Sequence, residues 1–199
     1  MAELRNVCVY CGSNTGNSPA YAAAAEALGR DMAKAGIRLI YGGGSVGLMG
    51  IVARSVLENG GAVTGIIPQF LKDREVMLKE VNELIVTDDM HDRKRIMFER
   101  ADAFVALPGG IGTLEELVEQ LTWSQLGQHT KPIVLANIAG YWDPLLALFA
   151  RMQEETFIRA GLNLNVNVVP EVSDILPTIF AIASGAEPRV AEETIPQKF

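Results

Sequence analysis

The chain has 199 residues, of which 49% are hydrophobic, and this size and composition fit one globular domain with a substantial core. A formal net charge of −7 argues against nucleic-acid binding, because no basic run is present to replace phosphate counterions. The longest apolar stretch, residues 141–150, is interrupted by Asp143 and Pro144 and is too short for a membrane span. The N-terminus is polar and shows no signal peptide, so we expect a cytoplasmic protein.

Strand-like apolar runs alternate with helical patterns along the chain. The predicted strands cover residues 6–10, 37–41, 62–67, 83–87, 103–107 and 132–137, with a weaker one at 165–169. The predicted helices cover residues 19–35, 48–58, 90–101, 113–126, 142–159 and 173–183. Segment 68–81 is rich in charge, and we expect a loop with a brief helix there.

This alternation predicts an α/β fold, a Rossmann-like doubly wound parallel sheet covered on both faces. The first helix has clear limits, with Ser18 as its N-cap, Pro19 in its first turn and Gly36 just beyond its end. We expect a single domain over residues 1–185, followed by a poorly ordered tail, 186–199.

Cys8 and Cys11 form a Cys-x-x-Cys pair within the first predicted strand. A redox pair of this type follows a strand and starts a helix, so we interpret these residues as small core side chains. With two histidines and no second cysteine pair, we expect no metal.

Glycine-rich loops follow three of the predicted strands, at residues 12–16, 42–47 and 108–112. Ligands bind outside the carboxyl ends of the strands in such sheets, so these loops are candidates for a ligand site. The second loop formally matches G-x-G-x-x-G, but the following strand ends without the acid that a dinucleotide ribose requires. No G-x-x-x-x-G-K-[ST] motif occurs either, so the pattern favours a mononucleotide or sugar phosphate over NAD or ATP.

The third loop belongs to the segment Pro108-Gly109-Gly110-Ile111-Gly112-Thr113-Leu114-Glu115-Glu116, where an apolar strand meets a glycine elbow that opens a helix. Bare backbone N–H groups and the positive end of the helix dipole suit an anion here, and those of Gly110, Gly112 and Thr113 are candidates for a phosphate. We expect the two glutamates in the first helical turn. Because they would repel a phosphate, a nucleotide with its phosphate at the glycines and its sugar near an acid best accounts for both features.

A second charged segment lies at residues 89–98. As a helix it places Arg93 and Lys94 on the same stripe as Met90 and Met97. Basic groups on a buried face require an anionic partner. The alternatives are an ion pair between Asp89 and Arg93, side-chain stems that reach out to solvent, or an anionic ligand at this edge of the sheet.

The run Met90-His91-Asp92-Arg93-Lys94, followed by the elbow Pro108 to Glu116, resembles the LOG family of cytokinin riboside 5′-monophosphate phosphoribohydrolases, whose members are often mislabelled lysine decarboxylases. The resemblance extends from residue 11 to about residue 170. It implies hydrolysis of the N-glycosidic bond of N6-modified adenosine 5′-monophosphates, or of AMP itself, to a free base and ribose 5-phosphate. It also implies a homodimer with the site near the subunit interface, and no cofactor.

The resemblance also implies the site. We expect Glu116 as the catalytic carboxylate, kept ionised by the helix N-terminus, with Glu115 as the alternative. Arg93 would hold the substrate or offset leaving-group charge, and Lys94 would contact a phosphate or hydroxyl. The full set of expected substrate contacts is Ser13, Gly44, Glu75, Arg93, Lys94, Gly110, Ile111, Gly112, Thr113, Glu115 and Thr122.

Two alternatives to this function are open. A non-catalytic nucleotide or cofactor carrier would use the same glycine elbows, although a carrier of an anion gains little from an acid such as Glu116 beside Arg93. A decarboxylase would require pyridoxal phosphate on a lysine, with an acid at the ring nitrogen. Lys94 is the only lysine near the predicted site, and nothing in the sequence marks that acid.

Overall fold

The computed structural model describes residues 4–72, 77–158 and 166–186. The strands are β1 (Asn6–Tyr10), β2 (Arg38–Tyr41), β3 (Val63–Pro68), β4 (Glu83–Thr87), β5 (Ala103–Ala106), β6 (Ile133–Ala136) and β7 (Asn167–Val169). The α-helices are α1 (Pro19–Lys34), α2 (Gly47–Glu58), α3 (Gln69–Lys72), α4 (Met90–Arg100), α5 (Ile111–Gln125), α6 (Asp143–Glu154) and α7 (Ile175–Ala183). Two 3₁₀ turns, at Ile138–Gly140 and Val172–Asp174, complete the described elements.

The strands form one seven-stranded sheet in the order β4-β3-β2-β1-β5-β6-β7, and every pair within it is parallel. The chain builds outward from β1 to β4 and then returns to place β5 on the other side of β1. The loops that follow β1 and β5 therefore leave the sheet in different directions. This topological switch point is where sheets of this kind open a crevice for a ligand.

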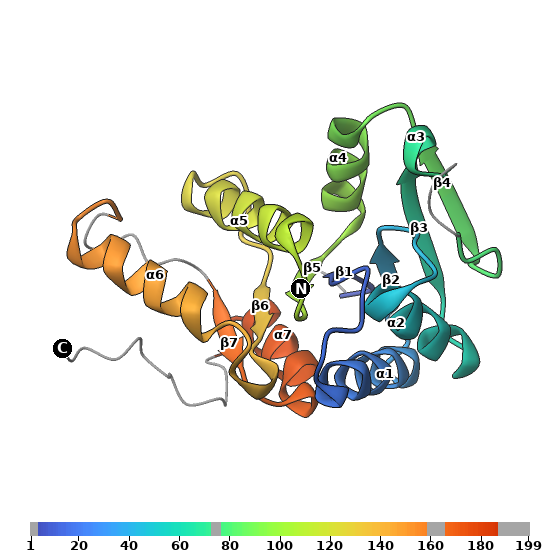
Figure 1. Ribbon diagram of the computed structural model, residues 1–199, viewed down its shortest axis with the longest axis horizontal. Coiled ribbons are helices and arrows are strands. Elements are labelled where there is room, and N and C mark those ends of the chain that lie inside the picture. The colour runs from blue at the N-terminus through green and yellow to red at the C-terminus, as the bar shows by residue number, and fades with distance from the viewer. Residues whose placement is uncertain (1–3, 73–76, 159–165, 187–199) are drawn as a thin grey trace.

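Helices cover both faces of the sheet, as Figure 1 shows. Alternate side chains of β1 enter two separate cores: Val7 and Val9 pack with residues of α1, α2 and α7, whereas Cys8 and Tyr10 pack with residues of α4, α5 and α6. Burial on both faces explains why the strands are apolar throughout rather than alternating. The doubly wound α/β prediction is thereby confirmed.

Most predicted elements lie within a residue or two of their expected bounds. Ser18 caps α1 by accepting a hydrogen bond from the Ala20 N–H at 3.3 Å, and Gly36 follows with a φ of 68°. The predicted helix over 142–159 ends earlier, at Glu154, and Thr156 just beyond it has a positive φ of 62°. The weak strand at 165–169 is present as Asn167–Val169, and α3 is the brief helix expected in segment 68–81.

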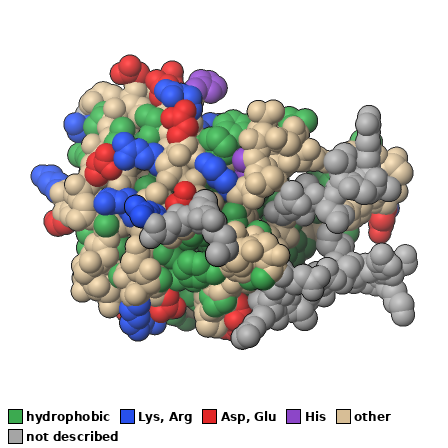
Figure 2. Space-filling model, turned by 180° about the vertical axis from the view of Figure 1, so that it is seen from behind, with side chains coloured by type: hydrophobic (Ala, Val, Ile, Leu, Met, Phe, Trp, Pro, Cys, Tyr) green, Lys and Arg blue, Asp and Glu red, His purple; other side chains and the backbone are tan. Residues whose placement is uncertain are grey.

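The two cysteines are free and buried, which agrees with their interpretation as core residues. Within the described ranges, no helix has both the length and the apolar character needed to cross a bilayer. On the face seen in Figure 2, Lys and Arg side chains lie among Asp and Glu side chains rather than in one basic patch. The expected tail falls mostly in residues 187–199, outside the described residues.

Candidate active site at the carboxyl edge of the sheet

The three glycine-rich loops are joined through the backbone of Gly12. Its N–H donates to the Pro108 carbonyl at 3.1 Å, and its own carbonyl accepts from the Leu48 N–H at 3.0 Å, at the start of α2. Gly47 has a φ of 61°, and a Cβ there would collide with the backbone of Ser13. Glycine is therefore required at this position for both conformation and close approach, and the loops after β1, β2 and β5 form one continuous edge.

The elbow after β5 leads into α5, which has Gly110 as its N-cap and no side-chain capping bond. A Cβ added to Gly110 or Gly112 would meet no atom within 4 Å, so the space around the first turn is open. The neighbouring Ile111 side chain is 81% exposed. An open helix N-terminus without a side-chain cap offers its N–H groups and its dipole to an anion.

Tyr141 supports this elbow from outside the predicted site. Its hydroxyl donates to the Gly109 carbonyl at 2.5 Å, and its ring makes an edge contact with Tyr21 of α1. Sequence reasoning missed Tyr141. The available signal was its position just after β6, another strand whose carboxyl end lies on this edge.

The expectation that both glutamates lie in the first turn of the helix is wrong. Because α5 begins at Ile111 rather than Thr113, its first turn carries no acid, and Glu115 and Glu116 fall in the second turn. One turn of helix is about 5.4 Å, so the carboxylates lie below the anion-binding N–H groups rather than beside them. This added distance lessens the repulsion that the sequence suggested between a bound phosphate and the two carboxylates.

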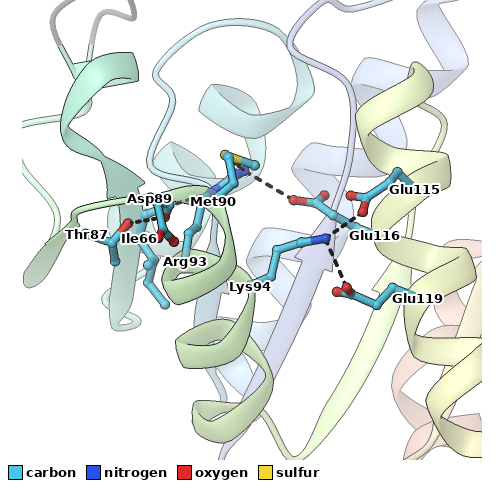
Figure 3. A network of polar contacts seen from close by, with 9 residues as sticks. All are labelled: Ile66, Thr87, Asp89, Met90, Arg93, Lys94, Glu115, Glu116 and Glu119. Atoms are coloured by element: carbon cyan, nitrogen blue, oxygen red, sulfur yellow. Dashed lines mark hydrogen bonds and ion pairs between the residues drawn. The ribbon is translucent and has the colours of Figure 1, made fainter.

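On the facing helix, α4, Arg93 is buried beside the sheet. Its Nε donates to the Ile66 carbonyl at 3.1 Å, and its Nη1 lies 3.4 Å from Oε1 of Glu116 (Figure 3). A Cβ on Gly42 would collide with the guanidinium, so the glycine that directly follows β2 makes room for it. Asp89 is not its partner: that carboxylate caps α4 by accepting from the Asp92 N–H at 2.8 Å.

Lys94, the next residue of α4, lies between two carboxylates of α5. Its Nζ is 2.6 Å from Oε1 of Glu115 and 2.9 Å from Oε1 of Glu119 (Figure 3). The cation that we expected to contact a phosphate or hydroxyl thus pairs with two protein carboxylates. Sequence reasoning did not include Glu119.

Glu116 is 9% exposed, and burial raises the pKa of its carboxyl group to about 7 although the charge of Arg93 acts to lower it. The neighbouring Glu115 carboxylate adds to the increase and Lys94 opposes it. With a pKa of about 7, the carboxyl is only partly ionised at neutral pH, so it is more readily protonated than the predicted effect of the helix N-terminus implies. Desolvation outweighs the dipole because Glu116 lies in the second turn and faces the core.

The other expected contacts differ in placement. Ser13 is exposed on the loop after β1, and Gly44 is buried and bridged to Met77. Thr122 is exposed and donates its hydroxyl to the Val118 carbonyl; six residues beyond Glu116, it is rotated by about 240° around α5, away from Arg93. Glu75 lies outside the described residues. Within the described ranges, no group of three or more His, Cys, Asp or Glu residues could hold a metal ion.

Together these features define a class of protein: a doubly wound α/β domain that brings an open, glycine-rich helix N-terminus and a buried arginine–glutamate pair to its topological switch point. Residues 49–179 match the family described as "Possible lysine decarboxylase". The chain is 49% identical over 170 residues to the "Probable cytokinin riboside 5′-monophosphate phosphoribohydrolase LOGL1" of Oryza sativa subsp. japonica, covering 85% of this chain and 76% of that protein. It is 43% identical over 175 residues to the "Cytokinin riboside 5′-monophosphate phosphoribohydrolase LOG2" of Arabidopsis thaliana, covering 88% and 82%. The chain belongs to this family, the LOG family.

Solved structures share the same fold. A molybdenum cofactor binding protein from Rippkaea orientalis superimposes with a TM-score of 0.70 at 24% identity, covering 92% of this chain and 99% of that one. The Moco carrier protein of Chlamydomonas reinhardtii gives the same TM-score, identity and coverage. At this level of identity the similarity concerns the fold alone.

Proposed function

We propose that the protein hydrolyses the N-glycosidic bond of adenosine 5′-monophosphates, N6-modified or unmodified, to release the free base and ribose 5-phosphate. The observation that carries the proposal is the pairing of Arg93 with Glu116 at 3.4 Å, one helical turn below the open elbow. Sequence identity of 43–49% to the named phosphoribohydrolases over 85–88% of the chain supports the same reaction.

In this proposal the 5′-phosphate binds to the N–H groups of Gly110, Gly112 and Thr113. Fixing the phosphate there orients the anomeric carbon of the ribose relative to Glu116, which is the positioning part of catalysis. The space next to these N–H groups is open, because a Cβ added to Gly110 or to Gly112 would meet no atom within 4 Å.

Glu116 then acts on the sugar. As the bond between the anomeric carbon and the base nitrogen breaks, its electron pair leaves with the base and positive charge grows on the ribose ring. The ionised carboxylate stabilises that charge and accepts a proton from the attacking water, whose oxygen bonds to the anomeric carbon. Arg93 is placed to offset the negative charge of the departing base. The base then takes up a proton on nitrogen from solvent, and Glu116 returns the proton of the attacking water to solvent, so the reaction consumes one water.

The family label of a lysine decarboxylase does not fit the lysine in this site. A Schiff-base lysine must react as a neutral amine. Burial acts to lower the pKa of Lys94, but its hydrogen bonds to Glu115 and Glu119 outweigh that effect and raise the pKa above its usual value. Lys94 is therefore held as a cation, and its environment supports a structural or electrostatic role.

Incubation of the protein with AMP and with isopentenyladenosine monophosphate, followed by a chromatographic assay for free base, tests the proposal. Release of base from either nucleotide supports it, and the unphosphorylated nucleosides are the control for the phosphate subsite. Nucleotide binding without base release at any protein concentration would instead favour a carrier. The similarity of fold to cofactor carriers makes that outcome the relevant alternative.

We also propose a cytoplasmic homodimer in which residues 1–185 form the catalytic domain and 186–199 a tail. The family resemblance supports the dimer, and the exposed position of Thr122 on α5, rotated away from Arg93, fits a contact made across two subunits. The free, buried thiols of Cys8 and Cys11 fit a reducing compartment. Light scattering on the purified protein tests the dimer, and a monomer at assay concentrations would contradict it.

A further inference from the structure

The charges on the two facing helices are unequal in number. Arg93 and Lys94 of α4 face three glutamates of α5, at positions 115, 116 and 119 (Figure 3). Arg93 is paired with Glu116, whereas Lys94 is shared by the other two carboxylates. The elbow motif accounts for Glu115 and Glu116, but Glu119 lies outside it.

Of the two glutamates that hold Lys94, Glu119 is the more firmly placed. Its side chain is 21% exposed, against 51% for Glu115, and the side chain of Lys94 is 14% exposed. An exposed ion pair contributes little to stability because water screens it and side-chain entropy opposes it. The contact at 2.9 Å between Lys94 and Glu119 is less screened, so it does more to fix the lysine.

The second carboxylate oxygen of Glu119 indicates that this side chain is fixed in position. Oε2 of Glu119 is buried and has no hydrogen-bond partner among the described residues. A buried acceptor without a partner is costly, and a glutamate free to move would turn that oxygen to water. The side chain is therefore held in place by its contact with Lys94.

We propose that Glu119 is a positioning residue of this site. It holds Lys94 beside α5 and so keeps that cation away from Arg93. Arg93 is then the single cation close to Glu116. The expected effect of Glu119 on turnover rests on the proposed function. The expected effect of Glu119 on the titration of Glu116 does not depend on the proposed function. In this arrangement Glu119 acts through Lys94 and through its own charge rather than through contact with the substrate.

The groups that face Glu116 give this arrangement a measurable consequence. They are Arg93 and Lys94 from α4, Glu115 and Glu119 from α5, and the un-ionised Cys8, Tyr10 and Cys11 from β1 and the loop that follows it. Removing the charge of Glu119 removes one carboxylate that repels the ionised Glu116. It also leaves Lys94 with one counter-charge fewer, so its positive charge acts more strongly on Glu116. Both changes favour the ionised form of Glu116.

The test is a pH titration of the Glu116 carboxyl in ligand-free protein, followed by ¹³C NMR of labelled glutamate and assigned with Glu116→Gln. In Glu119→Gln the midpoint should fall by about half a pH unit, as expected for loss of a charge several ångströms away. Lys94→Met removes the cation and should shift the midpoint upward. Glu99→Gln, on the exposed face of α4, is the matched control and should leave it unchanged.

The acid limb of kcat/KM for base release should move in the same directions as the NMR midpoints. Coincident titrations of Glu119→Gln, Glu99→Gln and wild type in folded protein would overturn the positioning role, even with turnover intact. Absence of base release from the wild type would overturn the proposed function, while the NMR shifts would still decide the role of Glu119. If Glu119→Gln does not fold, Glu119→Asp decides the proposal, because it keeps the charge but draws the carboxylate away from Lys94. A Glu116 midpoint equal to that of the wild type in folded Glu119→Asp refutes the positioning role.

Discussion

The guanidinium of Arg93 lies 3.4 Å from the carboxylate of Glu116, and both side chains are about one-tenth exposed. Each comes from a different helix, α4 and α5, and each helix starts at the carboxyl edge of the sheet. A buried carboxyl beside a buried arginine gains a counter-charge but loses water, and the loss is larger here. The result is an acid that can gain or lose a proton near neutral pH, which is the property a general base requires.

Glu116→Gln should leave nucleotide binding nearly intact and reduce the rate of base release on the order of 10²–10⁴-fold, because the amide cannot accept the proton of water. The measurement pairs calorimetric binding of AMP with the assay for free base. Glu154→Gln, an exposed substitution on α6, is the control for handling and folding. Full turnover by Glu116→Gln would refute the assignment and make Glu115→Gln the next variant to measure.

The activity should depend on pH through the same group. Since the ionised form of Glu116 is the reactive one, kcat/KM should rise about tenfold per pH unit below pH 7 and level off above the pKa of about 7. The substrate phosphate titrates near pH 6, so a ³¹P NMR titration of free AMP identifies its share of the profile. A rate that falls as pH rises through 7 would make Glu116 a general acid instead.

Gly42→Ala should act on the reaction through Arg93, because the added methyl would occupy the space of the guanidinium. Displacing a catalytic group by about 1 Å can cost on the order of 100-fold in rate. A double-mutant cycle is the measurement. In an Arg93→Ala background the methyl has room, so Gly42→Ala should cause little further loss. Additive losses in the double variant would show that Gly42 acts independently of Arg93.

Much of the fold could be predicted because the local signals agree with one another. Strands buried on both faces appear as unbroken apolar runs, and the glycine-rich ends mark where they stop. The start of α5 was misplaced because Gly112 gives no helix signal of its own, although its conformation within the helix is ordinary. That error of two residues moved both acids by slightly more than half a turn.

The charge pattern of the site was less predictable, because it depends on tertiary neighbours. Arg93 and Lys94 could be recognised as buried cations in need of anions, but Lys94 meets Glu119, 25 residues away, only once α4 and α5 pack. The raised pKa of Glu116 depends on burial, which no motif reports. Tyr141 contacts the elbow from a segment that carries no glycine motif linked to phosphate binding.

Gly112→Ala should separate folding from ligand binding. The added methyl meets no atom within 4 Å, and alanine in a helix is favoured over glycine by roughly 0.5–1 kcal/mol, so the thermal midpoint should stay or rise. If the first turn of α5 binds the 5′-phosphate, the methyl should raise KM for AMP by roughly tenfold or more through lost hydrogen bonds. Unchanged KM with unchanged stability would place the phosphate elsewhere.

Lys131 and His129 connect α4 with α5 at a place far from the glycine-rich loops. Its Nζ donates to the Phe98 carbonyl at 2.6 Å, near the end of α4, and lies 4.0 Å from the centre of the Phe98 ring. The neighbouring His129 has a buried ring whose Nδ1 accepts from the Lys131 N–H at 3.1 Å. Because this nitrogen accepts, the other one, Nε2, carries the hydrogen and donates to the Gln120 carbonyl of α5 at 3.2 Å.

Lys131→Met should therefore lower the free energy of unfolding by about 1–3 kcal/mol, since it removes a charged hydrogen bond and a cation–π contact while keeping an apolar stem of similar length. Urea denaturation followed by circular dichroism measures the loss. Arg151→Met, which removes an exposed pairing with Glu154 and Glu155, should change the same quantity by no more than about 0.5 kcal/mol. Because Lys131 acts on the spacing of α4 and α5 and not on substrate, the folded variant should keep a pH profile centred near that of the wild type. Equal stability of the two methionine variants would show that the Phe98 contacts contribute no more than a surface ion pair.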